Sequence, residues 1–184
     1  MTSSDVTALP PEALTQLVGQ VGALMVGDHE GSGMKVGIAC AKFNGGITWH
    51  LLQGALEELD ACGVERDGVR VAWVPGAFEL PLMARSFAAS GSVDAVVCLG
   101  AVIRGETGHY DFVAGECAAG IQRVQVHWGL PVVFGVLTTD TVDQALERSA
   151  PGPGNKGREA AATAVEMHRL LGRRPAPLTP IVPG

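Results

Sequence analysis

Four apolar runs rich in β-branched residues constrain the fold of this chain more than any other feature. They are MKVGIAC (34–40), VRVAWV (69–74), DAVVCLGAVI (94–103) and PVVFGVLTT (131–139). The runs are continuously apolar rather than alternating, which is typical of strands that are covered on both faces. We therefore expect four strands with helices packed on both sides of their sheet.

The segments between these runs have the apolar spacing of helices. In the segment after the first run, the apolar stripe consists of Ile47, Leu51, Leu52, Ala55 and Leu59. In the segment after His109, it consists of Val113, Cys117, Gly120, Ile121, Val124 and Trp128. A last, Ala-rich helix is expected from about Asn155 to Leu171. This alternation with short joints predicts an α/β fold, a flavodoxin-like three-layer αβα sandwich with a central four-stranded parallel sheet.

Composition limits the class of protein. The 184 residues suit one domain with a full core. The formal net charge of −6 argues against a nucleic-acid partner, and no apolar run is long enough for a membrane. The four cysteines are widely spaced among small or apolar residues, so we expect reduced, buried thiols and no metal site. The first 30 residues contain no Lys or Arg, unlike a signal or transit peptide, and we expect a cytoplasmic protein.

The chain divides into an N-terminal extension (1–33), a main domain (34–171) and a C-terminal tail (172–184). In the extension, the dipeptide Pro10–Pro11 resembles a helix start, and an apolar stripe at helical spacing follows it. That stripe consists of Leu14, Leu17, Val18, Val21, Leu24 and Met25. Two interpretations of this amphipathic helix stay open: it packs on its own domain, or it docks on another subunit or partner.

The joints between strands and helices are candidate binding sites, because ligands of open parallel sheets gather at the carboxyl ends of the strands. In the first joint, Phe43 is well placed to stack on a planar heterocycle, and two glycines after Asn44 let a ligand approach the backbone. In the second joint, the amides of Ala77 and Phe78 and the carboxylate of Glu79 suit the edge of a uracil-like ring. The plainer interpretations are a core Phe43, a helix cap at Asn44, and a Glu79 that complements the helix dipole.

The third joint, RGETGH at 104–109, carries the strongest chemical signal. Its consecutive amides precede a helix start and favour a phosphate. His109 lies at that helix start, where a neutral imidazole can take up and return a proton, although a merely capping histidine is the alternative. In the fourth joint, Thr139 or Asp140 is expected to cap a short helix that ends at Arg148. Arg148 and Lys156 are cations usable for phosphate, but each alone is more often a solvated surface charge. The residues thus indicate an α/β enzyme that binds a phosphate and a flat polar ring.

Taken together, the joints resemble the lumazine synthase family of riboflavin biosynthesis. The matching stretches cover residues 34–171 and are FNGGIT, VPGAFELP, GAVIRGETGHYDFV, PVVFGVLTTD and ALERSAPGPGNKGREAA. The resemblance implies a transferase that condenses 5-amino-6-(D-ribitylamino)uracil with 3,4-dihydroxy-2-butanone 4-phosphate. The products are 6,7-dimethyl-8-ribityllumazine, phosphate and water, and the reaction requires no cofactor.

The resemblance also implies roles for single residues. Phe43 is expected to stack on the pyrimidine, and His109 to shuttle protons. The substrate ring edge, the ribityl chain and the pocket wall are expected to involve Ala77, Phe78, Glu79, Ala101, Val102 and Ile103. The butanone phosphate is expected to contact Glu106, Thr107 and Arg148. In the family Phe134 reaches the pocket from a neighbouring subunit, and which subunit supplies Phe134 and Arg148 here stays open.

Family members assemble as pentamers, and in some lineages twelve pentamers close into a hollow icosahedral shell, so we expect at least a homopentamer. The sequence departs from the family at Gly108, often Pro or another residue, at Gly152, often Lys, and at Gly45–Gly46, commonly a bulkier pair. Two alternatives stay open. One is an archaeal-type riboflavin synthase, and the other is a non-catalytic flavin- or lumazine-binding shell protein of the same fold.

Overall fold

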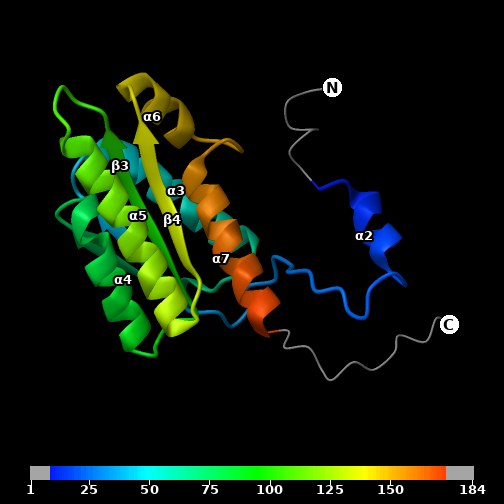
Figure 1. Cartoon of the computed structure of the whole chain (residues 1–184). Coiled ribbons are helices and arrows are strands. Elements are labelled where there is room, and N and C mark those ends of the chain that lie inside the picture. The colour runs from blue at the N-terminus through cyan, green and yellow to red at the C-terminus, as the bar shows by residue number, and fades with distance from the viewer. Residues whose placement is uncertain (1–8, 173–184) are drawn as a thin grey trace.

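A sheet of four parallel strands forms the middle layer of the computed structural model, which describes residues 9–172 (Figure 1). The strands are β1 (Val36–Ala41), β2 (Val69–Val74), β3 (Ala95–Ile103) and β4 (Val132–Thr139). Their order in the sheet is β2-β1-β3-β4, and every pairing is parallel. The predicted α/β fold with a four-stranded parallel sheet is confirmed.

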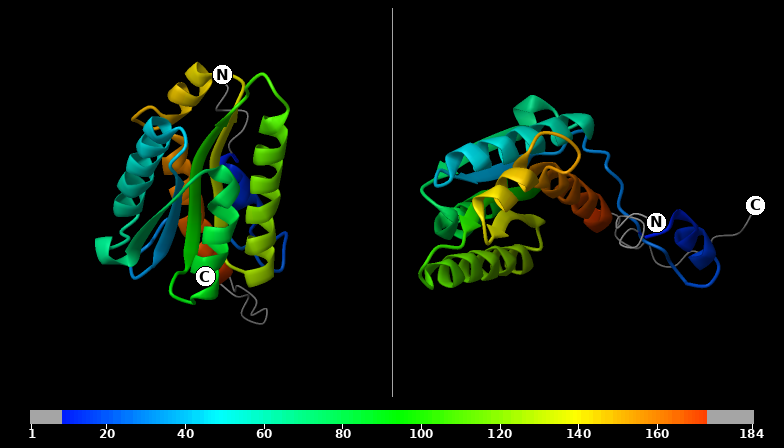
Figure 2. Two further views of the ribbon diagram at one scale, coloured as in Figure 1. Left: turned by 90° about the vertical axis from the view of Figure 1, so that its left-hand side faces the viewer. Right: turned by 90° about the horizontal axis from the view of Figure 1, so that it is seen from above.

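Helices cover the two faces of this sheet and make two separate cores (Figures 1 and 2). The helices on one face are α3 (Gly45–Ala61), α6 (Val142–Ser149) and α7 (Lys156–Gly172). Those on the other face are α4 (Leu80–Ala89) and α5 (His109–Trp128). Side chains of the central strands alternate between the two cores, so that Ile38 and Cys40 join the first core and Ala39 the second.

The edge strands are less buried than predicted. Every residue of β1 is buried, and in β3 only Ile103 is not fully buried. In β2, by contrast, Val71 and Trp73 are each 42% exposed. The prediction that all four runs are covered on both faces is wrong for β2, because the strand order puts it at an edge. Phe134 on the other edge strand, β4, is also exposed.

The predicted apolar stripes of α3 and α5 face the sheet. All five stripe residues of α3 are buried. In α5 the stripe is buried at Cys117, Gly120, Ile121 and Val124, while Val113 is half-buried. Trp128, at the last position of α5, is exposed, so the buried stripe ends before it.

The start of α6 lies later than predicted. We expected Thr139 or Asp140 as the cap, but Thr141 has this position, and its hydroxyl accepts a 3.2 Å hydrogen bond from the amide of Gln144. The Gln144 side chain in turn accepts a 2.9 Å bond from the amide of Asp140. This reciprocal pair resembles a capping box and explains the shift, because Gln144 is the third residue of the helix.

Small residues let α3 and α7 pack closely. A Cβ atom at Gly157 would lie 1.9 Å from the carbonyl oxygen of Leu51. The buried Asn155 sits just before α7, and its side-chain oxygen accepts a 2.8 Å bond from the Gly157 amide. Its side-chain nitrogen donates to the carbonyls of Ser149 and His50, at 2.7 and 3.1 Å. The predicted helix start at about Asn155 is confirmed.

The N-terminal helix α2 (Pro11–Leu17) begins at the predicted dipeptide but is shorter than the predicted stripe. It projects away from the sheet and its helices (Figure 2). The later apolar residues of the stripe are exposed, namely Leu17, Val18, Val21, Leu24 and Met25. In a single chain these side chains are therefore not buried on the main domain.

The extension rejoins the main domain at its last helix. Asp28 accepts a 2.8 Å bond from Nε of Arg169 in α7, and His29 lies 3.8 Å from the Glu166 carboxylate. Residues 1–8, and the predicted C-terminal tail beyond Gly172, lie outside the described residues. Within residues 9–172, no helix is both long and apolar enough to span a bilayer.

Candidate active site

A cavity of about 650 Å³ lies at the carboxyl edge of the sheet, where the first three joints meet. We call it the His109 cavity. The residues that line it are Phe43, Pro75, Gly76, Ala77, Phe78, Glu79, Ala101, Val102, Ile103, Gly105, Thr107, His109, Tyr110, Phe112 and Val113. Segments some 30 residues apart in the sequence meet here because parallel strands end at the same edge. The structure thus brings together most of the residues that the sequence predicts for a site.

Aromatic rings stand at the rim of this cavity. Phe43 is 71% exposed and Phe78 is 55% exposed, so neither ring is a core residue of the single chain. Exposed aromatic rings beside an apolar wall of Ala101, Val102 and Ile103 suit a flat, polar-edged ligand. The interpretation of Phe43 as a core residue is therefore wrong.

The joint after β1 is fixed by an unusual backbone position. Asn44 has a left-handed φ of 56°, and its Nδ2 donates a 2.9 Å hydrogen bond to the carbonyl of Ala101. The amide of Phe43 donates to the Pro75 carbonyl at 3.1 Å. Asn44 precedes α3, but its side chain does not cap that helix. It instead joins the first joint to Ala101 of β3. This contact fixes the position of the backbone directly after Phe43.

The second joint forms the 3₁₀ turn η2 (Ala77–Glu79) directly before α4. Its amides lie near the start of a helix, and the Glu79 carboxylate is half-buried beside Gly76. A Cβ atom at Gly76 would lie 3.3 Å from Oε2 of Glu79. This turn therefore presents backbone donors and one carboxylate to the same cavity, a pair that matches the edge of a uracil-like ring.

The third joint ends at His109, the first residue of α5, as predicted. Its imidazole is exposed and lines the cavity together with Gly105 and Thr107. Gly108 has a φ of −68°, a value that Pro also adopts, so the departure at this position leaves the backbone path unchanged. Amides at the positive end of a helix can hold an anion next to a group that carries a proton.

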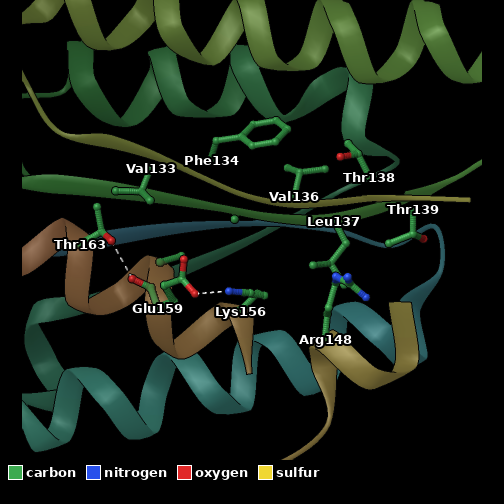
Figure 3. Close-up of a pocket in the computed structure, with 12 residues that line it drawn as sticks. Val133, Phe134, Val136, Leu137, Thr138, Thr139, Arg148, Lys156, Glu159 and Thr163 are labelled. Carbon is green, nitrogen blue, oxygen red and sulfur yellow. Dashed lines mark hydrogen bonds and ion pairs between the residues drawn. The ribbon is translucent and has the colours of Figure 1, made fainter. Parts of the chain in front are cut away.

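A second, separate cavity of about 330 Å³ contains the predicted residues Phe134 and Arg148. We call it the Arg148 cavity. It lies along β4 between α6 and α7, and Lys156, Glu159 and Thr163 also line it (Figure 3). Figure 3 shows the Phe134 ring on one side of β4 and the side chains of Arg148 and Lys156 on the other. The two cavities share no lining residue.

The cations of the Arg148 cavity already have partners in the single chain. Nη1 of Arg148 donates to the Gln144 carbonyl at 3.1 Å and lies 3.8 Å from the Glu147 carboxylate. Lys156 pairs with Glu159 one helical turn away. Both cations are nevertheless partly exposed, so an anion that enters from outside can compete for them.

The structure does not bring every predicted residue to one place. Glu106 is exposed but does not line the His109 cavity, and Phe134 and Arg148 line the other one. Sequence reasoning missed Tyr110 and Phe112, which line the His109 cavity from the first turn of α5. Their position directly after His109 was a usable signal, because residues in a helix's first turn lie close to the joint that precedes it.

The cysteines are free thiols and all are buried, as predicted. Burial raises the pKa of Cys40 and of Cys117 to about 12, and it raises the pKa of Cys98 as well. Such thiols stay protonated at neutral pH and make poor nucleophiles. Within residues 9–172, no group of three or more His, Cys, Asp or Glu side chains is arranged to hold a metal ion.

The chain is similar to known proteins over most of its length. A profile of 6,7-dimethyl-8-ribityllumazine synthase matches residues 33–172. A 6,7-dimethyl-8-ribityllumazine synthase of Protochlamydia amoebophila (strain UWE25) is 56% identical to the chain over 133 residues. That alignment covers 72% of this chain and 77% of the relative. The region that the profile matches contains the whole sheet and both cavities.

Proposed function

The chain belongs to the 6,7-dimethyl-8-ribityllumazine synthase family, which acts in riboflavin biosynthesis, and from this premise we propose how its two cavities carry out the reaction. The enzyme condenses 5-amino-6-(D-ribitylamino)uracil with 3,4-dihydroxy-2-butanone 4-phosphate. An amine attacks a ketone, water and phosphate leave, and a second ring closes. The observation that supports this best is the His109 cavity, where an exposed imidazole, a loop of amides and exposed aromatic rings meet.

The ribitylaminouracil occupies the part of the cavity next to the first two joints. Phe43 stacks on its ring, while η2 offers the amides of Ala77 and Phe78 and the carboxylate of Glu79 to the ring edge and the ribityl chain. The apolar end of β3 forms the wall behind it. Stacking and edge contacts together orient the amine for attack.

The butanone phosphate occupies the part of the cavity next to the third joint. The loop amides at 105–108 and the Thr107 hydroxyl hold its phosphate at the positive end of α5. His109 lies beside them and moves protons during imine formation and phosphate elimination. Alignment of two bound reactants lowers barriers by ~7–11 kcal/mol in favourable cases, and one general acid–base adds ~10²–10⁴-fold.

Two copies of the chain complete one site. Arg148 and Phe134 line a cavity that shares no residue with the His109 cavity, so a single chain offers two partial sites. Exposed apolar residues of the single chain, among them Trp73, Phe112 and Val126, are available for burial between subunits. We expect a cyclic homopentamer, in which each neighbour contributes Arg148, Lys156 and Phe134, and further closure into a shell is compatible with it.

We also expect the enzyme to work in the cytoplasm, where its four free thiols stay reduced. The central test mixes purified protein with both substrates and follows the absorbance and fluorescence of lumazine above the spontaneous rate. Acceleration supports the proposal. No acceleration by folded, oligomeric protein would favour the non-catalytic shell, and riboflavin formed from lumazine alone would favour the archaeal-type riboflavin synthase.

A further inference from the structure

The side chain of Arg104 is held from three directions at the start of the third joint. Its Nε donates a 3.0 Å hydrogen bond to Oδ1 of Asp140, just beyond β4. Its Nη1 donates a 3.2 Å bond to Oδ1 of Asp111 in the first turn of α5. Its guanidinium carbon lies 4.0 Å from the centre of the Tyr110 ring. The backbone amide of Arg104 also donates to the Thr139 carbonyl, at 2.9 Å.

This arrangement leaves Arg104 poorly suited to bind a substrate phosphate. Two carboxylates surround one guanidinium, and together they raise its pKa, with the Asp140 bond as the main cause. Arg104 and its two carboxylate partners together therefore carry a net negative charge. Gly105, Thr107 and Tyr110 line the His109 cavity, whereas Arg104 does not.

The loop that Arg104 opens has little to fix it in place by itself. Gly105 and Gly108 have open space around them, since a Cβ atom at either would meet nothing within 4 Å. Glycines in such a loop add backbone freedom, which a precise phosphate site must restrict. Arg104 holds the loop at its first residue, and through Tyr110 and Asp111 it holds the residues just after His109.

We propose that Arg104 is a positioning residue that clamps the end of β4 to the first turn of α5 and so fixes the phosphate loop and His109 between them. This inference rests on the proposed function of the His109 cavity. Exposed ion pairs contribute little to overall stability, so the effect of the clamp lies in the geometry of the loop. Misplacement of a reacting group by about 1 Å can lower a rate ~10²-fold.

The variants Arg104→Gln, Arg104→Lys and Asp140→Asn test the clamp. Arg70→Gln is the matched control. Arg70 is also exposed, but it lies at the amino end of β2, away from the His109 cavity, and its side chain donates a hydrogen bond to Ser92. For Arg104→Gln we expect kcat/KM for the butanone phosphate to fall about 10- to 100-fold, while KM for the ribitylaminouracil and the melting temperature change little. Arg104→Lys should be intermediate, because an ammonium can pair with a carboxylate but cannot bridge two and stack on a ring.

The Asp140→Asn variant separates the clamp from direct phosphate binding. If Arg104 bound the phosphate, removal of a competing carboxylate would tighten binding of inorganic phosphate and maintain or raise kcat/KM. The clamp predicts instead that Asp140→Asn lowers kcat/KM, and that adding it to Arg104→Gln causes little further loss, since both act through one unit. An unchanged or improved Asp140→Asn enzyme would overturn the inference.

Hydrogen exchange supplies a readout that does not depend on turnover. In Arg104→Gln the amides of residues 104 and 111, which donate to the carbonyls of Thr139 and Gly108, should exchange faster, while those in the middle of α5 keep their wild-type protection. Wild-type exchange at these two amides would contradict the clamp even if activity fell. Failure of the proposed function looks different, because the wild-type protein itself would then produce no lumazine.

Discussion

The Nδ2 atom of Asn44 donates a 2.9 Å hydrogen bond to the carbonyl oxygen of Ala101, which links the joint after β1 to a β3 residue that lines the His109 cavity. Asn44 makes this contact from a left-handed backbone conformation, with a φ of 56°. Asn tolerates this conformation better than most residues. One side chain therefore fixes both the turn after Phe43 and its distance from β3.

Replacement of Asn44 separates these two contributions. Asn44→Ala loses the hydrogen bond and places a Cβ-bearing residue without a compensating side chain in the left-handed region, which costs ~1–2 kcal/mol. Asn44→Gly loses only the bond. We expect Asn44→Ala to lower the free energy of unfolding more than Asn44→Gly, and both to raise KM for the ribitylaminouracil. Equal unfolding free energies for the two variants would show that the left-handed backbone at position 44 does not destabilise Asn44→Ala.

His109→Ala should lower turnover by ~10²–10⁴-fold, the usual contribution of a general acid–base group. The imidazole is exposed at the start of α5, so the melting temperature and the oligomer mass should stay at their wild-type values. Single-turnover absorbance measurements, with light scattering on the same samples, check both statements. A variant with full activity would exclude His109 as the proton carrier.

Mixing two inactive variants tests the proposal that neighbouring subunits build one site together. His109→Ala and Arg148→Ala each damage one of the two cavities. When equal amounts are unfolded together and reassembled, about one quarter of the sites in a ring of heterologous contacts should combine an intact His109 with an intact Arg148. Recovered activity near that fraction supports a site built from neighbours. Recovery no greater than that of the separate variants would place both groups in one chain's site.

Gly157→Ala should destabilise the main domain, because the new methyl would lie 1.9 Å from the Leu51 carbonyl oxygen. The helices must then separate, and overpacking of this kind costs ~1–3 kcal/mol. Gly154→Ala is the control, since its Cβ would have nothing within 4 Å. Chemical denaturation of both variants measures the difference, and two equal midpoints would disprove close packing at this position.

The buried thiols should resist modification in the native protein. Their raised pKa values keep Cys40 and Cys117 protonated far above neutral pH, and Cys98 is shifted in the same direction. The unfolded chain, by contrast, ionises near the ordinary thiol value of 9.0. The free energy of unfolding should therefore fall as pH rises from about 9 towards 12. Rapid labelling of Cys40 or Cys117 by a disulfide reagent at pH 8, without unfolding, would contradict this burial.

Much of the fold follows from the sequence because strand and helix periodicities are local signals. The four runs and the stripe of α3 need no knowledge of distant residues. The order of strands in the sheet is not local, and that order decides that Val71 and Trp73 lie exposed at an edge. For the same reason the apolar character of β2 led to a wrong expectation of burial.

Site residues were predictable where the reactive side chains lie together in one joint. They were not predictable where a contact connects two joints that are far apart in the sequence. His109 and Thr107 follow a few residues after the end of β3, in the joint that lines the cavity. The role of Arg104 depends on Asp140, 36 residues later, and no sequence pattern near Arg104 predicts that it pairs with Asp140. Phe134 and Arg148 also show this limit, since motif order alone does not reveal that they line a different cavity from His109.

The ion pair between Asp28 and Arg169 joins the last part of the N-terminal extension, shortly before β1, to the last helix of the main domain, α7. Residues 28 and 169 are thus held together on either side of the sheet-forming part of the chain, away from the joints of the His109 cavity. Such a chain lends itself to circular permutation. In a chain trimmed to this region, a short linker could join the segments next to Asp28 and Arg169, and new termini could open at Gly91, an unobstructed turn of positive φ between α4 and β3.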